Sequence, residues 1–205
     1  MPVGANPRFP AKALGPRAQR MVLKIIEATR EVFLSHGYSG TTIDEIARVA
    51  EVSRATFYTY FTSKREVLIA LGELTAAECH AMVVQLDDHN SSLRLLRAWV
   101  GDYFEFLDVH GSFAFAWTQA AQEDEEVRVA GMRRHLALCR RLGKALGGNL
   151  KRPVADPASL GIVAFGVLER TWLYGQLYTD AIDRERLIGL VADSLWSTTR
   201  QSLSA

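Results

Sequence analysis

Hydrophobic residues recur along almost the whole chain at the three- and four-residue spacing of amphipathic α-helices. The first such stretch runs from Arg17 to His36, and Gly37 follows in the position where glycine commonly ends a helix. No segment shows a convincing alternation of apolar and polar residues, the pattern of a half-buried β-strand. The pattern therefore predicts an all-α fold.

Two short helices are predicted after Gly37. Thr42 stands three residues before Glu45, the spacing of a capping box, and this predicts a helix that ends near Ala50. After a break of three residues, Ser53 can cap a second short helix. Two short helices joined by a tight turn indicate a helix-turn-helix, whose second helix can enter the DNA major groove, although any helical hairpin shares this spacing.

The rest of the chain predicts longer helices. One begins near Ser63, and the Gly111-Ser112 pair is expected to form a turn between two others. Asp156 and Asp183 are expected to cap the last two helices. With the three N-terminal helices, about nine are expected, the later ones over 93–107, around 113–117, from the acidic run 123–126 to Lys144 and the closing Gly147, over 157–179 and over 183–201.

Composition places the chain among globular proteins. Its 48% hydrophobic and 23% charged residues suit a packed core. No apolar run approaches the ~20 residues that cross a bilayer, so no membrane partner is expected. Residues 1–16 contain four prolines but no apolar signal segment. We therefore expect a mobile N-terminal tail on a cytoplasmic protein.

Charge is unevenly distributed along the chain. Residues 1–65 hold ten Lys and Arg against five Asp and Glu, whereas residues 66–205 hold fourteen against eighteen. A basic N-terminal third suggests a local polyanion site, although a solvated basic face would have the same composition. Arg8, Lys12 and Arg17 are candidates for a DNA-binding arm or for a solvated tail.

A catalytic or metal-binding site is the alternative to a DNA-binding surface. The five histidines are scattered, and no Ser/His/Asp grouping, metal-ligand spacing or phosphate-binding glycine loop occurs. Cys79 and Cys139 are expected to be buried free thiols. We therefore expect no enzyme activity, no metal and no cofactor. An all-α enzyme, or a helical adaptor with a helix-turn-helix that does not bind DNA, remains the alternative to a DNA-binding protein.

The segment TTIDEIARVAEVSRATFYTYFTSKREVL resembles the signature region of TetR-family (tetracycline-repressor-like) transcriptional regulators, and the resemblance covers roughly residues 20–70. It implies a three-helix DNA-binding domain over 17–64 and a larger helical domain over 65–205 that binds a ligand and dimerises. The implied protein is a ligand-responsive regulator, a repressor, which binds a palindromic double-stranded operator as a homodimer and is released by a small apolar molecule.

The resemblance also implies roles for individual residues. Thr42, Tyr60 and Lys64 would contact phosphates, while Arg54, Thr56 and Tyr58 would face the groove. Lys64 could instead be a solvated lysine, and Tyr58 and Tyr60 could instead be core aromatics. Phe57 and Phe61 are interpreted as core aromatics. The full set of expected DNA-binding residues is Thr41, Thr42, Ser53, Arg54, Ala55, Thr56, Tyr58, Thr59, Tyr60 and Lys64.

Two positions depart from the family pattern, which often has glycine at both. Glu51 is expected to adopt the left-handed conformation, at a cost of ~1–2 kcal/mol for a non-glycine residue. The Ala55 methyl group can contact a thymine methyl or limit how closely the backbone approaches DNA. These departures affect which operator is bound.

Aromatic residues concentrate in the predicted C-terminal domain and suggest an apolar ligand site. Core packing is the alternative for any single ring. Glu169 and Arg170 form either a structural ion pair or an anchor for the polar end of a ligand, and Arg133, Arg134, Arg140 and Arg141 are interpreted as an exposed face. The expected ligand-binding residues are Trp99, Tyr103, Phe113, Trp117, Phe165, Glu169 and Trp172.

The last two helices are expected to pair with their copies in a second subunit. Their apolar content exceeds what one small domain needs to bury, which is the reason for this expectation. The positions concerned are Leu160, Val163, Val167, Ile188, Val191 and Leu195.

Overall fold

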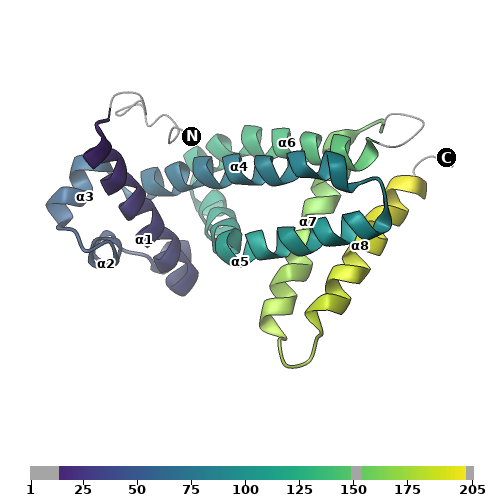
Figure 1. The fold of residues 1–205 in the computed structure, drawn as a ribbon. Helices are drawn as coiled ribbons and strands as arrows, with labels where there is room; N and C mark the ends of the chain where they lie inside the picture. Colours follow the sequence, from purple (N-terminus) through teal and green to yellow (C-terminus); the bar gives the residue numbers. More distant parts are fainter. Residues whose placement is uncertain (1–13, 149–153, 202–205) are drawn as a thin grey trace. The chain divides into compact units, whose positions relative to one another are not determined.

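A computed structural model describes residues 14–148 and 154–201 of the chain. In these ranges the chain forms eight helices and no strand, so the predicted all-α fold is confirmed (Figure 1). The helices are α1 (Pro16–Gly40), α2 (Ile43–Val49), α3 (Arg54–Tyr60), α4 (Lys64–His89), α5 (Leu93–Glu123), α6 (Glu125–Gly147), α7 (Pro157–Leu177) and α8 (Arg184–Gln201).

Helix α1 is interrupted at Gly37, where the sequence predicted its end. The backbone there has φ 65° and ψ −179°, a conformation that residues with a Cβ rarely adopt. One further turn, up to Gly40, follows the break. This turn was not among the helices that the sequence predicted.

The helix-turn-helix, defined here as residues 42–60, has the local geometry that its sequence predicted. The Thr42 side chain accepts a hydrogen bond from the Glu45 N–H at 3.2 Å, and that of Ser53 accepts one from the Thr56 N–H at 3.0 Å. Glu51, in the turn, has a φ of 49°, which confirms the expected left-handed conformation. The Lys24 Nζ donates to the Glu51 carboxylate at 2.9 Å, a contact on the strained turn that the sequence did not predict.

The predicted turn at Gly111-Ser112 is wrong, because α5 continues through it to Glu123. A Cβ on Gly111 would lie only 2.2 Å from the indole of Trp172 on α7. Glycine at this position therefore makes room for a large side chain of a neighbouring helix, and the backbone stays helical. A sequence pattern cannot distinguish this use of glycine from a helix stop.

The fold divides into two compact units. The first unit comprises the described residues up to Ala77 together with Ser112–Met132, and the second comprises Glu78–Gly111 and the described residues from Arg133 onward. Helices α4, α5 and α6 each contribute a part to both units. The predicted division at residue 64 separates a DNA-binding domain from a ligand-binding domain by function and not by compactness. It stays a prediction.

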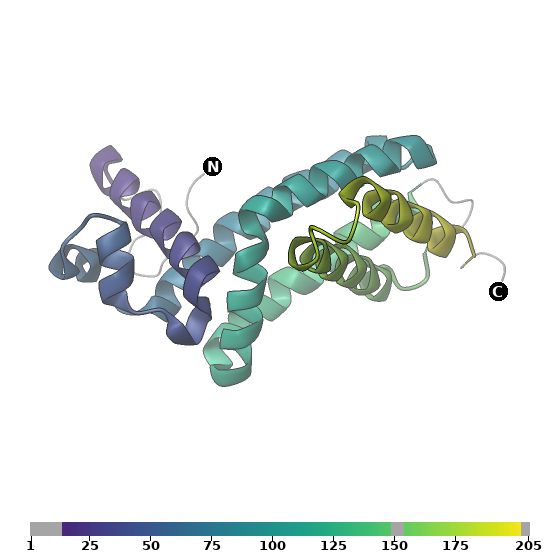
Figure 2. The ribbon, with the colours of Figure 1, turned by 90° about the horizontal axis from the view of Figure 1, so that it is seen from below.

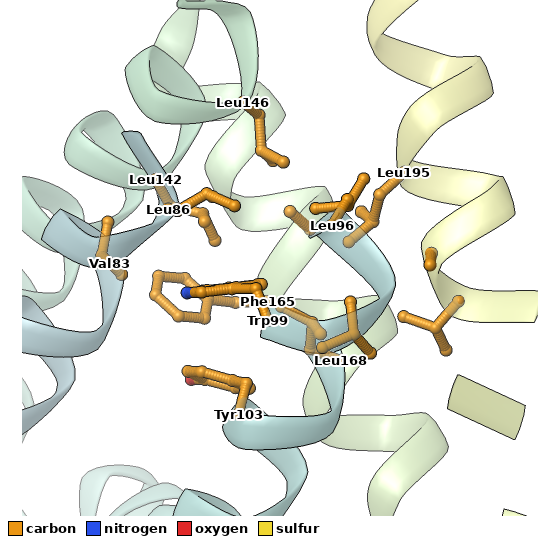
Figure 3. Close-up of a cluster of buried hydrophobic side chains, with 14 of the residues drawn as sticks. Val83, Leu86, Leu96, Trp99, Tyr103, Leu142, Leu146, Phe165, Leu168 and Leu195 are labelled. Carbon is orange, nitrogen blue, oxygen red and sulfur yellow. The ribbon is translucent and has the colours of Figure 1, made fainter. Parts of the chain in front are cut away.

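Each unit has its own hydrophobic core. In the first unit, Ile25, Ile46, Phe57 and Leu68 from α1 to α4 are fully buried together. In the second, Trp99 and Phe165 pack among aliphatic side chains of α4 to α8 (Figure 3).

Helices of the second unit approach one another closely. Helices α7 and α8 form an antiparallel pair joined by a short loop (Figures 1 and 2). Helix α7 crosses α6 at Gly161, where a Cβ would lie 1.8 Å from the Cys139 carbonyl oxygen. Since that neighbour is backbone, the crossing requires glycine. The predicted caps at Asp156 and Asp183 are confirmed by hydrogen bonds from backbone N–H groups of α7 and α8.

Helix α4 is the single described helix that is long and apolar enough to cross a membrane, by length and composition alone. No apolar run of this length was expected from the sequence, and by this measure α4 is an exception. Core helices of globular proteins have the same composition, and α4 buries Val67, Leu68, Leu71, Val83 and Leu86 in the two cores.

Candidate nucleic-acid interface and aromatic cluster

Helix α3 has one buried side and one exposed side. Phe57 is fully buried in the core of the first unit, as the sequence predicted, and Phe61 follows it there. Arg54, Ala55, Tyr58 and Thr59 are exposed. The exposed side therefore combines a cation, a methyl group, a phenol and a hydroxyl, a combination suited to contacts with base edges and phosphates.

The hydroxyl groups around this surface already have local partners. Thr42 and Ser53 are exposed and cap α2 and α3, and the half-buried Thr56 hydroxyl lies 2.8 Å from the Ser53 hydroxyl. The Thr59 hydroxyl donates to the Ala55 carbonyl at 3.0 Å. Each of these hydroxyls retains a lone pair, so capping is compatible with accepting or sharing a further hydrogen bond.

Arg54 is held by an acidic residue that the sequence analysis did not single out. Its Nη1 donates to both carboxylate oxygens of Asp44 on α2, at 2.6 and 2.7 Å. Its Nη2 lies 3.4 Å from the Tyr58 hydroxyl. The Asp44 carboxylate raises the pKa of Arg54, so the guanidinium stays charged while both side chains remain mostly exposed.

Two predicted DNA-binding residues, Thr41 and Lys64, have mainly internal contacts in the structure. Thr41 is 2% exposed, and its hydroxyl donates to the Gly37 carbonyl at 2.6 Å. The Lys64 Nζ donates to the carbonyl oxygens of Tyr38 and Thr41, at 2.7 and 3.0 Å, and lies 4.5 Å from the centre of the Tyr38 ring. Burial lowers the pKa of this half-buried Lys64. Both side chains therefore fasten the end of α1, and the expected DNA contact of Thr41 is not supported by its burial.

The break in α1 is also closed by a residue far away in the sequence. The Gln119 Oε1 on α5 accepts hydrogen bonds from the backbone N–H groups of Tyr38 and Ser39, at 2.8 and 3.3 Å. The Ser39 hydroxyl donates to the Glu123 carboxylate at 3.2 Å. Gln119 thus acts as a cap for the turn after Gly37, and no local sequence signal indicates a partner 81 residues away.

The same junction of α5 and α6 contacts the start of α4. Arg65 pairs with Asp124 at 3.1 Å and with Glu126 at 3.2 Å. Asp124 also accepts hydrogen bonds from the N–H groups of Glu126 and Val127, and so caps α6. Since residues 38–39 precede the helix-turn-helix and Arg65 follows it, the junction holds the helix-turn-helix at both ends.

The aromatic cluster of the second unit contains five of the seven expected ligand residues. Trp99 and Tyr103 stack with ring centres 5.2 Å apart, and Phe165 lies 6.2 Å from Tyr103 (Figure 3). The Trp99 indole N–H donates to the Met82 carbonyl at 2.9 Å, and that of Trp172 donates to Asp108 at 2.8 Å. These rings are buried and their polar atoms have partners, which is the arrangement of a packed core.

Glu169 brings a carboxyl group into this apolar surrounding. Burial raises its pKa to about 7, and the positive charge of Arg170 opposes that shift. Arg170 itself lies over the ring of Tyr174, 5.9 Å from its centre. The nearby thiols of Cys79 and Cys139 are free and buried, as predicted, and burial raises their pKa values to about 12 and about 11. These thiols are therefore poor nucleophiles at neutral pH.

Phe113 and Trp117, the other two expected ligand residues, belong to the first unit. They are half-buried against its core, with ring centres 5.6 Å apart. A Cβ on Gly131 of α6 would lie 2.0 Å from the Trp117 indole, so this ring is fitted against the α6 backbone. The structure therefore assigns the seven residues to two separate units.

The apolar residues of the last two helices differ in exposure from what was expected. Ile188, Val191 and Leu195 are buried within the core of their own unit, so they cannot form a face between subunits. Val163 remains exposed, as predicted. The other exposed apolar residues of α7 and α8 are Ile162, Tyr174, Leu177 and Leu190.

Two groups of basic residues were expected to be exposed, one near the N-terminus and one on α6. Arg8 and Lys12 lie outside the described residues, whereas Arg17 is exposed at the start of α1. In the basic cluster, Arg133, Arg134 and Arg140 are exposed and Arg141 pairs with Asp87.

Among the described residues, no group of three or more His, Cys, Asp or Glu is placed to hold a metal ion.

Comparison with known proteins gives matches to regulators. A family model for bacterial regulatory proteins of the tetR family matches residues 25–71. The HTH-type transcriptional regulator SrpR of Pseudomonas putida is 34% identical over 98 residues, which are 48% of this chain and 43% of SrpR. The uncharacterized HTH-type transcriptional regulator TtgW, also of Pseudomonas putida, is 33% identical over 98 residues, 48% of this chain and 69% of TtgW. The matched segment thus spans less than half of SrpR.

A solved structure shares the fold over most of the chain. The structure of FadR from Bacillus subtilis, in complex with stearoyl-CoA, has a TM-score of 0.62 and 20% sequence identity. The match covers 85% of this chain and 97% of FadR.

Proposed function

Because this chain belongs to the TetR family of bacterial regulatory proteins, we propose that it is a ligand-responsive transcriptional repressor that acts in the cytoplasm. The family match over residues 25–71 includes the helix-turn-helix, and α3 there exposes Arg54, Ala55, Tyr58 and Thr59. This exposed polar surface is the observation that carries the proposal. The proposed chemistry is reversible binding, without a catalytic step.

Within this proposal, α3 is the recognition helix. Arg54 and Tyr58 contact base edges, and Thr42 and Ser53 contact phosphates near the starts of α2 and α3. Tyr60, half-buried at the end of α3, remains a candidate for a phosphate contact. Lys64 is proposed to act mainly by fastening the end of α1, because its ammonium group donates to two carbonyl oxygens.

Selection of double-stranded DNA from a random pool tests this function directly. We expect enrichment of a palindromic sequence, bound with an affinity that falls steeply as salt concentration rises, because phosphate contacts release counterions. Arg54→Ala is expected to relax the preference at one base position in each half-site. Failure to enrich any sequence, combined with binding that does not depend on salt, would contradict the proposed function.

The operator is expected to be palindromic because we propose a homodimer that pairs through α7 and α8. Exposed Val163, Leu177 and Leu190 on these helices support that face. In a two-fold dimer the two recognition helices would lie about one DNA turn apart, ~34–36 Å. Val163→Glu should shift the sedimentation velocity profile toward monomer and weaken operator binding. Leu34→Glu, which changes an exposed leucine of α1, is the matched control and should leave the dimer intact.

The proposed ligand is a small apolar molecule. Support comes from the Trp99, Tyr103 and Phe165 rings and from the half-buried carboxyl of Glu169. Burial raises the pKa of the Tyr103 phenol, and the negative charge of Glu169 contributes to that shift. This carboxyl can hold one polar group of a ligand. FadR of Bacillus subtilis, which shares the fold, was solved with stearoyl-CoA. A ligand releases DNA only through a difference in its affinity for the free and DNA-bound conformations.

A ligand screen by thermal shift, followed by operator release, tests this site. Glu169→Gln keeps the volume of the side chain and should change the affinity for any ligand with a polar group. Glu105→Gln, at an exposed position of α5, is the control and should leave that affinity unchanged. Equal affinities for wild type and both variants would place the ligand site elsewhere.

A further inference from the structure

The contact between Asp44 and Arg54 joins the first turn of α2 to the first residue of α3. Both oxygens of the carboxylate accept from the same nitrogen, Nη1, at 2.6 and 2.7 Å. The Tyr58 hydroxyl lies 3.4 Å from Nη2, and its ring centre is 5.6 Å from the guanidinium carbon. The guanidinium is therefore held from two sides, although 59% of the Arg54 side chain is exposed.

This arrangement leaves one edge of the guanidinium without a carboxylate. Asp44 accepts only from Nη1, and the Tyr58 hydroxyl takes at most one of the two Nη2 hydrogens, so the edge formed by Nε and Nη2 retains donors for a further partner. Two parallel N–H donors on one edge match the O6 and N7 acceptors of a guanine. Arg54 can therefore make a bidentate base contact while it keeps its contact with Asp44.

Holding the side chain in advance also has an energetic consequence. A free arginine side chain loses rotamer entropy when it is fixed. Asp44 imposes part of that order before DNA is bound. Its negative charge also weakens the attraction of Arg54 for phosphate groups, which is the attraction that dominates binding to random DNA.

We propose that Asp44 is a positioning residue for operator recognition, which aims Arg54 at a guanine base and lowers its affinity for phosphate. This inference rests on the proposed DNA-binding function. It assigns a role in specificity to an acidic residue at a surface that binds a polyanion.

The chain offers a matched control in the next residue. Glu45 lies in the same first turn of α2 and also pairs with an arginine, because its Oε1 is 2.7 Å from the Arg48 Nη2. Asp44→Asn and Glu45→Gln each remove one negative charge from the positive end of the same helix, so their effects on the helix and on net charge are alike. The two variants differ in which arginine loses its carboxylate.

The test uses the full chain, a duplex selected from a random pool and a random-sequence duplex of equal length. Binding of each variant to both duplexes is measured by fluorescence anisotropy over a range of salt concentrations. For Asp44→Asn, we expect binding to random DNA to tighten several-fold and the ratio of operator to random affinity to fall about ten-fold. The salt slope on random DNA should steepen by about one per subunit. For Glu45→Gln, both affinities should change by the same factor.

A second substitution shows whether Asp44 acts through Arg54. In an Arg54→Ala background, Asp44→Asn should no longer alter the ratio of operator to random affinity. A ratio that stays within about two-fold of wild type in Asp44→Asn, or an equal change with and without Arg54, would overturn the inference alone. A wild-type protein that shows no preference for the selected duplex would overturn the proposed function, and this inference with it.

Discussion

Each of the two compact units has its own hydrophobic core, and the units differ in the further contacts that join their helices. In the first unit, the helix-turn-helix is bounded by polar contacts at or near the surface, such as those of Lys64, Gln119 and Arg65 with residues far away in the sequence. In the second unit, long helices are joined by buried rings, such as Trp99 and Phe165, and by a close backbone crossing at Gly161.

This difference indicates which parts of each unit can change conformation at a small cost in free energy. A surface hydrogen bond contributes about 1 kcal/mol net, so a segment held by several of them can adjust when a partner binds. A packed core loses several kcal/mol when one large side chain or one close crossing is disturbed. We therefore expect substitutions in the second unit to affect stability most, and those in the first to affect DNA binding with smaller losses of stability.

Gly161→Ala should have the largest effect. The new methyl group would lie 1.8 Å from the Cys139 carbonyl oxygen, and backbone cannot move aside as a side chain can, so α6 and α7 must separate. We expect the free energy of unfolding to fall by about 3 kcal/mol, measured by urea denaturation. Gly101→Ala, a helical glycine of the same unit with open space beside it, should not destabilise the protein. Equal losses in both variants would show that the close crossing is not the cause.

The next effect concerns pH and Glu169. Its pKa is raised to about 7 in the folded protein, from an unfolded value near ~4.3. Below the unfolded pKa the Glu169 carboxyl is protonated in both the folded and the unfolded state. Between the two pKa values the unfolded chain loses this proton while the folded protein keeps it, so the stability of the folded protein falls as pH rises from the unfolded to the folded pKa. The titration of Glu169 should therefore lower the free energy of unfolding by about 2–3 kcal/mol between about pH 4.5 and pH 8. Glu169→Gln should flatten that part of the pH dependence, whereas Glu105→Gln should preserve it; identical pH profiles for both would contradict the assignment.

A smaller loss is expected for Lys64→Met, which keeps the apolar stem and removes the ammonium group. The carbonyl oxygens of Tyr38 and Thr41 then lose a donor each, at a cost of about 1–2 kcal/mol of unfolding free energy. Denaturation without DNA measures this loss. Unchanged stability combined with weaker binding to all DNA sequences would instead support the phosphate contact that the sequence analysis predicted for Lys64.

The smallest effect is expected for Gln119→Met, which removes the acceptor of the Tyr38 and Ser39 N–H groups. A loss of about 1 kcal/mol corresponds to roughly five-fold faster hydrogen exchange at these two amides. Gln119→Glu keeps an acceptor oxygen and should exchange at close to the wild-type rate. Fast exchange in both variants, or in neither, would show that the cap does not depend on this oxygen.

The sequence determined the features that rest on neighbouring residues. Thr42 and Ser53 cap helices because each lies within three residues of the N–H group that it accepts from. Gly37 and Glu51 mark turns, since backbone conformation there depends on the residue and its immediate neighbours. For the same reason the all-α fold and the buried side of α3 were predictable.

Tertiary structure decided the features that join distant segments. Gly111 was predicted to form a turn because glycine often ends a helix. In the structure it makes room for the Trp172 ring of another helix, and the sequence pattern does not distinguish these two uses of glycine. The partner of Asp44 is Arg54 on α3. Gln119 and Lys64 both contact the backbone of Tyr38, near the end of α1. A side chain's hydrogen-bonding capacity is fixed by its chemistry, but the group that satisfies it is fixed only when the packed cores bring distant backbone together.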